Sequence, residues 1–227
     1  MAIVEVRNLS RTYKQGNLDV PALRGVDLDI EPGEFTVLMG PSGSGKTTLL
    51  NQIGALDEPD GGSVKVEGRE LSGMKKSELA KLRLERIGFV FQAYNLIPVL
   101  TAYENAEFVL LMQGKSKAER QQIVMETLKT VGLEGMEGRR PTELSGGQQQ
   151  RVAVARAIAG GPALVLADEP TANLDSATGY ALIETMKKLN EEQGVTFVFA
   201  THDPKVMEHA RRIVRLVDGK ITEDIRK

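Results

Sequence analysis

Two patterns of hydrophobic and polar residues divide the chain. Residues 3–7 and 26–31 alternate apolar with charged side chains, which predicts half-buried antiparallel strands. Short apolar runs follow at 35–39, 87–91, 163–167 and 195–200. Such runs are typical of strands buried on both faces, as in a parallel sheet covered by helices. The pattern predicts an α/β fold with a mainly parallel sheet and an N-terminal antiparallel β-subdomain.

The segment between the second and third of these runs has helical character. A helix is predicted over 103–113, and Ser116 with Glu119 forms a capping-box pattern that opens another. We interpret 93–160 as a helical subdomain inserted into an α/β core. That core is formed by 1–92 and 161–227, so the chain is expected to be a single domain.

Three further expectations concern the periphery of this core. A loop is predicted over Thr12–Pro21, and it carries Tyr13. This tyrosine is either a half-buried aromatic residue or a ring on which a base stacks, and its position alone favours the first. Near the C-terminus, Asp218-Gly219 predicts a type I′ hairpin, followed by a solvated tail from Glu223 to Lys227.

The most specific signal is Gly40–Thr47, which fits G-x-x-x-x-G-K-[ST] between a predicted strand and a predicted helix. Its glycines let backbone N–H groups converge on phosphate oxygens, and the helix that begins near Lys46 adds unpaired N–H groups there. Lys46 would reach the β- and γ-phosphates of a nucleotide, and the Thr47 hydroxyl would bind Mg²⁺. A glycine-rich turn that binds nothing is the disfavoured alternative, because every position of the pattern is matched.

Polar residues end three other predicted core strands, where open α/β sheets place their ligands. Asp168 is suited to hold Mg²⁺ through water, which leaves Glu169 to orient and polarise an attacking water. His202 would donate a hydrogen bond to the γ-phosphate or hold that water. Gln92 occupies the equivalent place on its own strand. The alternatives are an acidic loop, a capping histidine and a polar strand end.

A second anion-binding helix start is predicted at Leu144–Gln148. Ser145 and Gln148 form a capping-box pattern, and Gly146-Gly147 exposes backbone N–H groups at the start of a helix over 148–159. The plain alternative is an ordinary helix start. It is weakened because the same chain already carries one anion-binding helix start.

Composition narrows the class of protein. The 227 residues carry a formal net charge of −2, which argues against a nucleic-acid protein held by a broad basic face. The absence of cysteine excludes disulfides, thiolate metal sites and cysteine nucleophiles. No secretory signal is apparent, and no window approaches the apolar length of a membrane span. Any membrane role is therefore expected to go through a partner.

Taken together, these motifs resemble the nucleotide-binding subunit of an ABC transporter over essentially the whole chain, and they imply the ABC ATPase fold with its P-loop NTPase core. By this resemblance Tyr13 stacks on adenine, and ATP is bound by Gly40, Pro41, Ser42, Gly43, Ser44, Gly45, Lys46, Thr47, Thr48 and Gln92. The resemblance implies Mg²⁺ ligands at Thr47, Gln92 and, through water, Asp168, and catalytic roles for Glu169 and His202. It identifies Asn173–Asp175 as the D-loop, with Asp175, and Leu144, Ser145, Gly146, Gly147 and Gln148 as the signature that meets the ATP of a partner subunit.

The finer resemblance is to the branch of lipoprotein-release ATPases and macrolide exporters, on the segments 91–98, 100–105 and 144–151. It implies an ATP-dependent dimer of two copies, with ATP between the phosphate loop of one and the signature of the other. The implied partners are a separate integral membrane permease and, through it, a periplasmic or extracytoplasmic adaptor, with no nucleic acid. The chain is then expected in the cytoplasm, peripheral on the inner face of the membrane.

Three alternatives stay open from the sequence. A non-transport ABC ATPase would act on DNA or ribosomes, but the tandem cassettes or basic extensions usual there do not appear in this sequence. A regulatory cassette in a cell-envelope complex would bind ATP without useful turnover. A GTPase or small-molecule kinase is weaker, because it leaves the Leu144–Gln148 segment unexplained.

Overall fold

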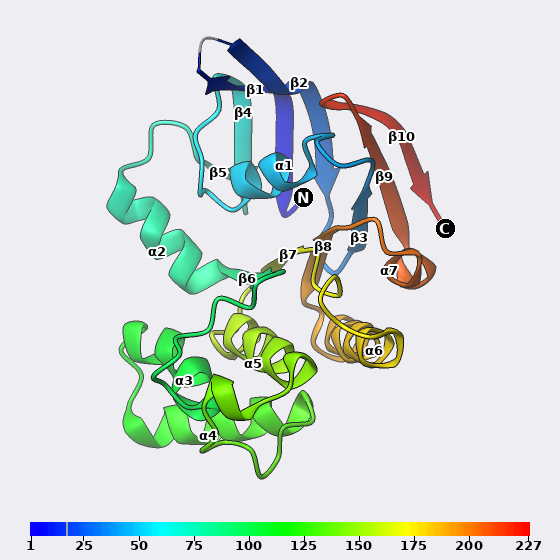
Figure 1. The fold of residues 1–227 in the computed structure, drawn as a ribbon. Coiled ribbons are helices and arrows are strands. Elements are labelled where there is room, and N and C mark those ends of the chain that lie inside the picture. The colour runs from blue at the N-terminus through cyan, green and yellow to red at the C-terminus, as the bar shows by residue number, and fades with distance from the viewer. Residues whose placement is uncertain (17) are drawn as a thin grey trace.

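Two β-sheets form the centre of the computed structural model, which describes residues 1–16 and 18–227 (Figure 1). The smaller sheet is antiparallel, with strand order β2-β1-β4-β5. Its strands are β1 (Val4–Gln15), β2 (Leu18–Ile30), β4 (Gly61–Val66) and β5 (Arg69–Glu70). The predicted N-terminal antiparallel subdomain is confirmed.

The predicted loop over 12–21 is wrong. Strand β1 continues to Gln15 and β2 begins at Leu18, with Tyr13 opposite Val20. Side chains in this outer part of the hairpin are exposed on both strands, so the alternation of apolar and charged residues fades there. Backbone pairing between β1 and β2 maintains this part of the hairpin, and a short stretch of sequence does not reveal such pairing. Tyr13 therefore lies on a strand, and Asn17 lies outside the described residues.

The larger sheet has strand order β10-β9-β3-β8-β7-β6. All neighbours are parallel except the edge pair of β9 and β10. The strands are β3 (Phe35–Met39), β6 (Ile87–Phe91), β7 (Leu164–Asp168), β8 (Thr196–Ala200), β9 (Arg212–Val217) and β10 (Lys220–Arg226). The mainly parallel sheet is confirmed, and the four predicted apolar runs form β3, β8, β7 and the edge strand β6.

The C-terminal hairpin is confirmed and extends further than predicted. Asp218 and Gly219 have φ of 49° and 76°, the two left-handed residues that a type I′ turn requires. The solvated tail, however, is a strand: Asp224 pairs with Val214 and Ile225 with Ile213. Its side chains are exposed, and the backbone pairing together with ion pairs from Glu223 and Asp224 to β9 distinguishes it from a tail.

Helix α1 (Lys46–Ile53) lies between the two sheets, next to β1 and β4 in Figure 1. Its Leu49, Leu50 and Ile53 join one core with β1, β2 and β4 on one side and β3 and β8 on the other. The opposite face of the parallel sheet packs on α5 (Gly146–Ala159) and α6 (Ser176–Gln193). The glycine-rich loop that precedes α1 is therefore held at the junction of both sheets.

The remaining helices are α2 (Lys76–Arg86), α3 (Ala102–Met112), α4 (Lys117–Thr130), the short 3₁₀ helix η1 (Pro141–Glu143) and α7 (Pro204–His209). Figure 1 shows α3, α4 and α5 gathered at one end of the molecule, away from the antiparallel sheet. The capping boxes at Ser116 and Ser145 are confirmed. Because Ser145 is the cap, α5 begins at Gly146 and not at 148. Within the described residues, no helix has the length and apolar character that crossing a bilayer requires.

Candidate functional site

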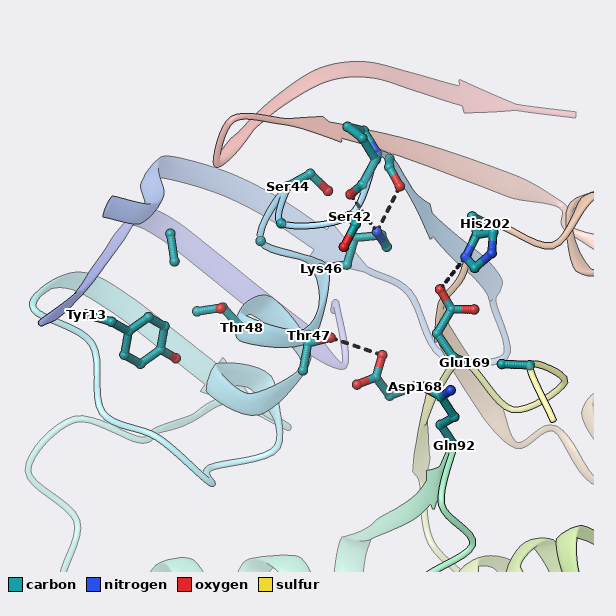
Figure 2. A pocket seen from close by; sticks show the side chains of 16 residues that line it. Tyr13, Ser42, Ser44, Lys46, Thr47, Thr48, Gln92, Asp168, Glu169 and His202 are labelled. Atoms are coloured by element: carbon teal, nitrogen blue, oxygen red, sulfur yellow. Dashed lines mark hydrogen bonds and ion pairs between the residues drawn. The ribbon is translucent and has the colours of Figure 1, made fainter. Parts of the chain in front are cut away.

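The parallel strands converge on one cavity of about 660 Å³ (Figure 2). Strands β3, β6, β7 and β8 each end at it and deliver, in turn, the glycine-rich loop, Gln92, Asp168 with Glu169, and His202. Carboxyl ends of parallel strands share one edge of a sheet, which is where open α/β folds bind ligands. The lining is Tyr13, Ala22, the continuous stretch 40–48, Gln92, Asp168, Glu169, Ala172 and His202.

The glycine-rich loop needs glycine for two different reasons. A Cβ on Gly40 would lie 2.1 Å from the carbonyl oxygen of Leu216, so no side chain fits there. Gly45 has a φ of 101° and is the N-cap of α1, a conformation that favours glycine. No side chain among the described residues caps α1. The first residues of α1, Lys46 to Thr48, line the cavity, so their N–H groups offer it an anion-binding helix start.

Lys46 and Ser44 place polar atoms inside this loop. The Lys46 ammonium donates to the carbonyl oxygens of Gly40 and Pro41, at 2.8 and 3.0 Å, and the side chain is almost fully buried. Ser44 Oγ is buried and has no hydrogen-bond partner within the described part of the chain. A buried cation next to an unpaired hydroxyl and free helical N–H groups matches the chemistry of a phosphate chain.

The carboxylate of Asp168 faces the start of α1. Thr47 Oγ1 donates to Asp168 Oδ1 over 3.2 Å. Burial raises the pKa of Asp168 above its ordinary value, and the Thr47 hydrogen bond and the charge of Lys46 oppose that rise. No cluster of three or more His, Cys, Asp or Glu side chains in the described ranges forms a metal site by itself. The donors fit Mg²⁺, which combines a hydroxyl and a carboxylate with water and phosphate oxygens.

Glu169 is held in a strained conformation at the end of β7. Its φ of 45° is left-handed, which is uncommon for a residue with a side chain. One carboxylate oxygen lies 2.7 Å from His202 Nδ1, and the other accepts a hydrogen bond from Thr201 Oγ1 at 2.9 Å. Both residues line the cavity, and Figure 2 shows their side chains pointing toward one another.

The segment after Glu169 is tied to the end of β6. Asn173 Nδ2 donates to the backbone oxygen of Gln92 over 2.9 Å. Asp175 does not line the cavity; it caps α6 by accepting hydrogen bonds from the N–H groups of Ala177 and Thr178.

The predicted second anion site lies elsewhere. None of the residues 144–148 lines the cavity. Ser145 Oγ accepts from the N–H of Gln148, and Gln148 Oε1 accepts from the N–H of Ser145. The structure thus brings Tyr13, the glycine-rich loop, Gln92, Asp168, Glu169 and His202 together, and leaves 144–148 and Asp175 apart from them.

Tyr13 lies on β1 and lines the cavity. Two residues that contact it, Arg11 and Asp57, were not predicted from the sequence. The Tyr13 hydroxyl donates to Asp57 Oδ2 at 2.8 Å, and the guanidinium of Arg11 lies 4.9 Å from the Tyr13 ring centre. Arg11 also forms ion pairs with Asp57 and Asp60. Neither Arg11 nor Asp57 belongs to a recognisable motif, so no sequence signal identified them; the same holds for Thr201.

Comparison with known proteins places these features in context. The family model described as "ABC transporter" matches residues 23–172. The chain is 46% identical to the macrolide export ATP-binding/permease protein MacB of Marinobacter nauticus over 98% of its own length, but it spans only 34% of that protein. It is also 46% identical to the lipoprotein-releasing system ATP-binding protein LolD of Anaeromyxobacter dehalogenans, covering 97% of this chain and 93% of that one.

A solved structure agrees with this. The fold matches the ATP-binding cassette MJ0796, described as a dimer in a post-hydrolysis state bound to ADP and Pi, with a TM-score of 0.92. The two chains are 46% identical, and the alignment covers 98% of each. The corresponding sequence is that of an uncharacterized ABC transporter ATP-binding protein of Methanocaldococcus jannaschii.

Proposed function

This chain belongs to the ABC transporter family as an ABC ATPase cassette, and from that premise we propose that it binds and hydrolyses ATP to drive a separate membrane permease. The observation that supports this most directly is the convergence of one glycine-rich loop, one half-buried carboxylate and one Glu–His pair on a single cavity. Hydrolysis requires that a nucleoside triphosphate and the attacking water are both held in this cavity.

In this proposal the loop residues 40–48 bind the phosphates of ATP, and Lys46 neutralises charge on the β- and γ-phosphates. Thr47, Gln92 and, through water, Asp168 hold Mg²⁺, which supplies further neutralisation of phosphate charge when it is bound. Glu169 accepts a hydrogen bond from the attacking water and orients it toward the γ-phosphate. His202 holds Glu169 and lies where it would contact that phosphate, and Tyr13 stacks on adenine.

A second copy of the chain completes the site. The segment Leu144–Gln148 is a capped helix start that does not line the cavity of its own subunit. In a head-to-tail dimer the signature of one copy, centred on Ser145, closes over the ATP of the other, and Asp175 lies near that junction. The dimeric state of MJ0796 supports this arrangement.

The proposed membrane partner is inferred from the names of two relatives. MacB is named as a combined ATP-binding and permease protein, and LolD as the ATP-binding protein of a releasing system. We place this chain on the cytoplasmic face of the membrane, attached peripherally to integral permease subunits. A periplasmic or extracytoplasmic adaptor would be reached only through that permease.

The Glu169→Gln variant tests the chemistry. Loss of a general base is expected to lower kcat by roughly 10²- to 10⁴-fold while ATP binding persists. Glu134→Gln, at a highly exposed glutamate remote from the cavity, serves as the matched control and retains full turnover. Near-normal turnover in Glu169→Gln would remove Glu169 from its assigned role.

The dependence of specific activity on protein concentration tests whether two subunits share the site. Specific activity is expected to rise with concentration as dimers form, while the monomer binds ATP and hydrolyses it poorly. Equal activity per subunit in a demonstrated monomer would contradict the dimeric site. Absence of turnover even with a permease bound would indicate a regulatory cassette, and recovery of ribosomes or DNA without a permease would indicate a non-transport ABC ATPase.

A further inference from the structure

We propose that Thr201 is a positioning residue for Glu169: its hydroxyl fixes the direction of that carboxylate during ATP hydrolysis. The inference rests on the proposed function, because it needs Glu169 to orient the water. It concerns a residue that does not line the cavity and that lies one position before the exposed His202.

The backbones of the two residues are fixed against each other. The N–H of Glu169 donates to the carbonyl oxygen of Ala200 at 2.8 Å, and the N–H of Thr201 donates to that of Leu38 at 3.1 Å. Strands β7, β8 and β3 are therefore locked together at the level where both side chains emerge. Thr201 itself is fully buried. Its hydroxyl has little freedom to choose another partner.

The direction of the side-chain hydrogen bond is also determined. Thr201 Oγ1 accepts a hydrogen bond from the N–H of Asp203 at 3.0 Å. A hydroxyl carries a single proton, and with its oxygen already accepting, that proton is free to be donated to Glu169 Oε2, 2.9 Å away. A charge-assisted bond of this kind is stronger than one between neutral groups.

The loop that carries Thr201 is itself supported from the segment after Glu169. Thr171 Oγ1 donates to Asp203 Oδ2 at 2.7 Å. The chain thus closes a ring of contacts: Glu169 to Thr201, Thr201 to Asp203, Asp203 to Thr171, which lies two residues beyond Glu169. These contacts hold Thr201 in place, so the Glu169 carboxylate cannot turn away without breaking its bond to a fixed hydroxyl.

Thr201 and His202 hold Glu169 in different ways. The side chain of His202 is 76% exposed, whereas that of Glu169 is 18% exposed and Thr201 is buried. A solvent-exposed imidazole is free to leave Glu169 and meet a phosphate, but the hydroxyl is not. Thr201 therefore keeps the strained Glu169 aimed while His202 changes partner, and this separates its role from that of the histidine.

Matched substitutions test the inference in the full-length chain. Thr201→Val keeps the shape and removes the hydroxyl, and we expect kcat to fall about 10- to 100-fold with the Kd for ATP changed less than about twofold. Thr201→Ser keeps the hydroxyl and is expected to retain kcat within about threefold. If Thr201→Val does not fold, Thr201→Ala replaces it, and thermal unfolding is recorded for every variant.

A double substitution distinguishes positioning of Glu169 by Thr201 from a general contribution of Thr201 to the structure. In a Glu169→Gln background, Thr201→Val is expected to lower kcat by less than about twofold further, because the carboxylate that it positions is already gone. Equal losses in Thr201→Val and Thr201→Ser, or a full additional loss in the double variant, would overturn the inference. A wild-type protein without turnover even as a dimer with a permease bound would instead refute the proposed function, so the two failures are distinguishable.

Discussion

Gly147 of the signature lies directly against Thr178 on the first turn of α6. A Cβ added to Gly147 would stand 2.2 Å from Thr178 Cγ2. Thr178 is not free to turn away, because its hydroxyl donates to Asp175 Oδ2. The glycine is therefore required by packing within one subunit, whatever ligand the signature meets, and it links the signature to Asp175.

This contact predicts a rescue. Gly147→Ala overpacks the site and is expected to destabilise the protein by about 1–3 kcal/mol. Thr178→Ser removes the clashing methyl group and keeps the hydroxyl on Asp175, so the double variant Gly147→Ala/Thr178→Ser should recover most of that loss. Denaturant unfolding measures it. Gly138→Ala, where a Cβ meets open space, is the control. A double variant no more stable than Gly147→Ala would contradict the packing argument.

A second prediction concerns the ring of Tyr13. Base stacking contributes about 1–3 kcal/mol, so Tyr13→Ala is expected to weaken ATP binding by roughly 5- to 150-fold. Tyr13→Phe keeps the ring but loses the hydrogen bond to Asp57, and a smaller loss is expected. Calorimetry with ATP and with inorganic triphosphate makes the comparison, because triphosphate lacks a base. Equal weakening for both ligands would show that Tyr13 does not contact adenine.

The half-buried carboxyl of Asp168 predicts that stability and metal binding oppose each other at this position. Its pKa is raised above 3.8 mainly by burial. Between 3.8 and that raised value the native protein holds a proton that the unfolded chain has released, so stability falls as pH rises, and the cost is fully present above that raised value. Asp168→Asn is therefore expected to raise the unfolding temperature without nucleotide or Mg²⁺, and to weaken Mg²⁺-dependent ATP binding by roughly 10- to 100-fold.

Differential scanning calorimetry at pH 7 measures the first effect, and ATP titrations with and without Mg²⁺ measure the second. Asp19→Asn, at an exposed position on β2, is the control and should change neither. A lower unfolding temperature for Asp168→Asn would contradict the assigned cost of burial.

A fourth prediction concerns Arg212, whose side chain is only 5% exposed. It pairs with Glu34 at 2.9 Å and with both oxygens of Asp224, at 2.8 and 2.7 Å. Arg212→Met leaves these carboxylates without their main partner and is expected to cost about 3–5 kcal/mol in unfolding free energy. Arg215→Met, on the same strand but paired with Glu223 at the surface, should cost at most about 1 kcal/mol.

The ion pair between Arg212 and Asp224 also predicts how stability depends on pH. Hydrogen bonds from Arg212 hold the pKa of Asp224 below 3.8. The stabilisation that follows is present above pH 3.8 and is lost as pH falls through the lower, native value. Asp224→Asn should therefore flatten the acid limb of the stability curve below pH 3.8, which acid titration followed by circular dichroism tests. An unchanged limb would show that other carboxyl groups dominate acid unfolding.

Local signals in the sequence predicted well those features that depend on neighbouring residues. The capping boxes at Ser116 and Ser145, the left-handed turn at Asp218-Gly219 and the strand–loop–helix around Lys46 all depend on hydrogen bonds within a few residues. The same reasoning failed where pairing partners are distant. The outer hairpin around Tyr13 and the C-terminal strand have exposed side chains, so no periodicity marks them.

The candidate site divides in the same way. The sequence by itself determined which residues are candidates for binding phosphate and Mg²⁺ and for orienting water, because a glycine-rich loop and a strand end carry that chemistry in a few adjacent positions. Only the tertiary structure decided that Thr201 fixes Glu169, that Asp57 and Arg11 hold Tyr13, and that Gly147 packs on Thr178. Those contacts depend on which strands and helices lie side by side, and strand order is set by packing of the whole chain.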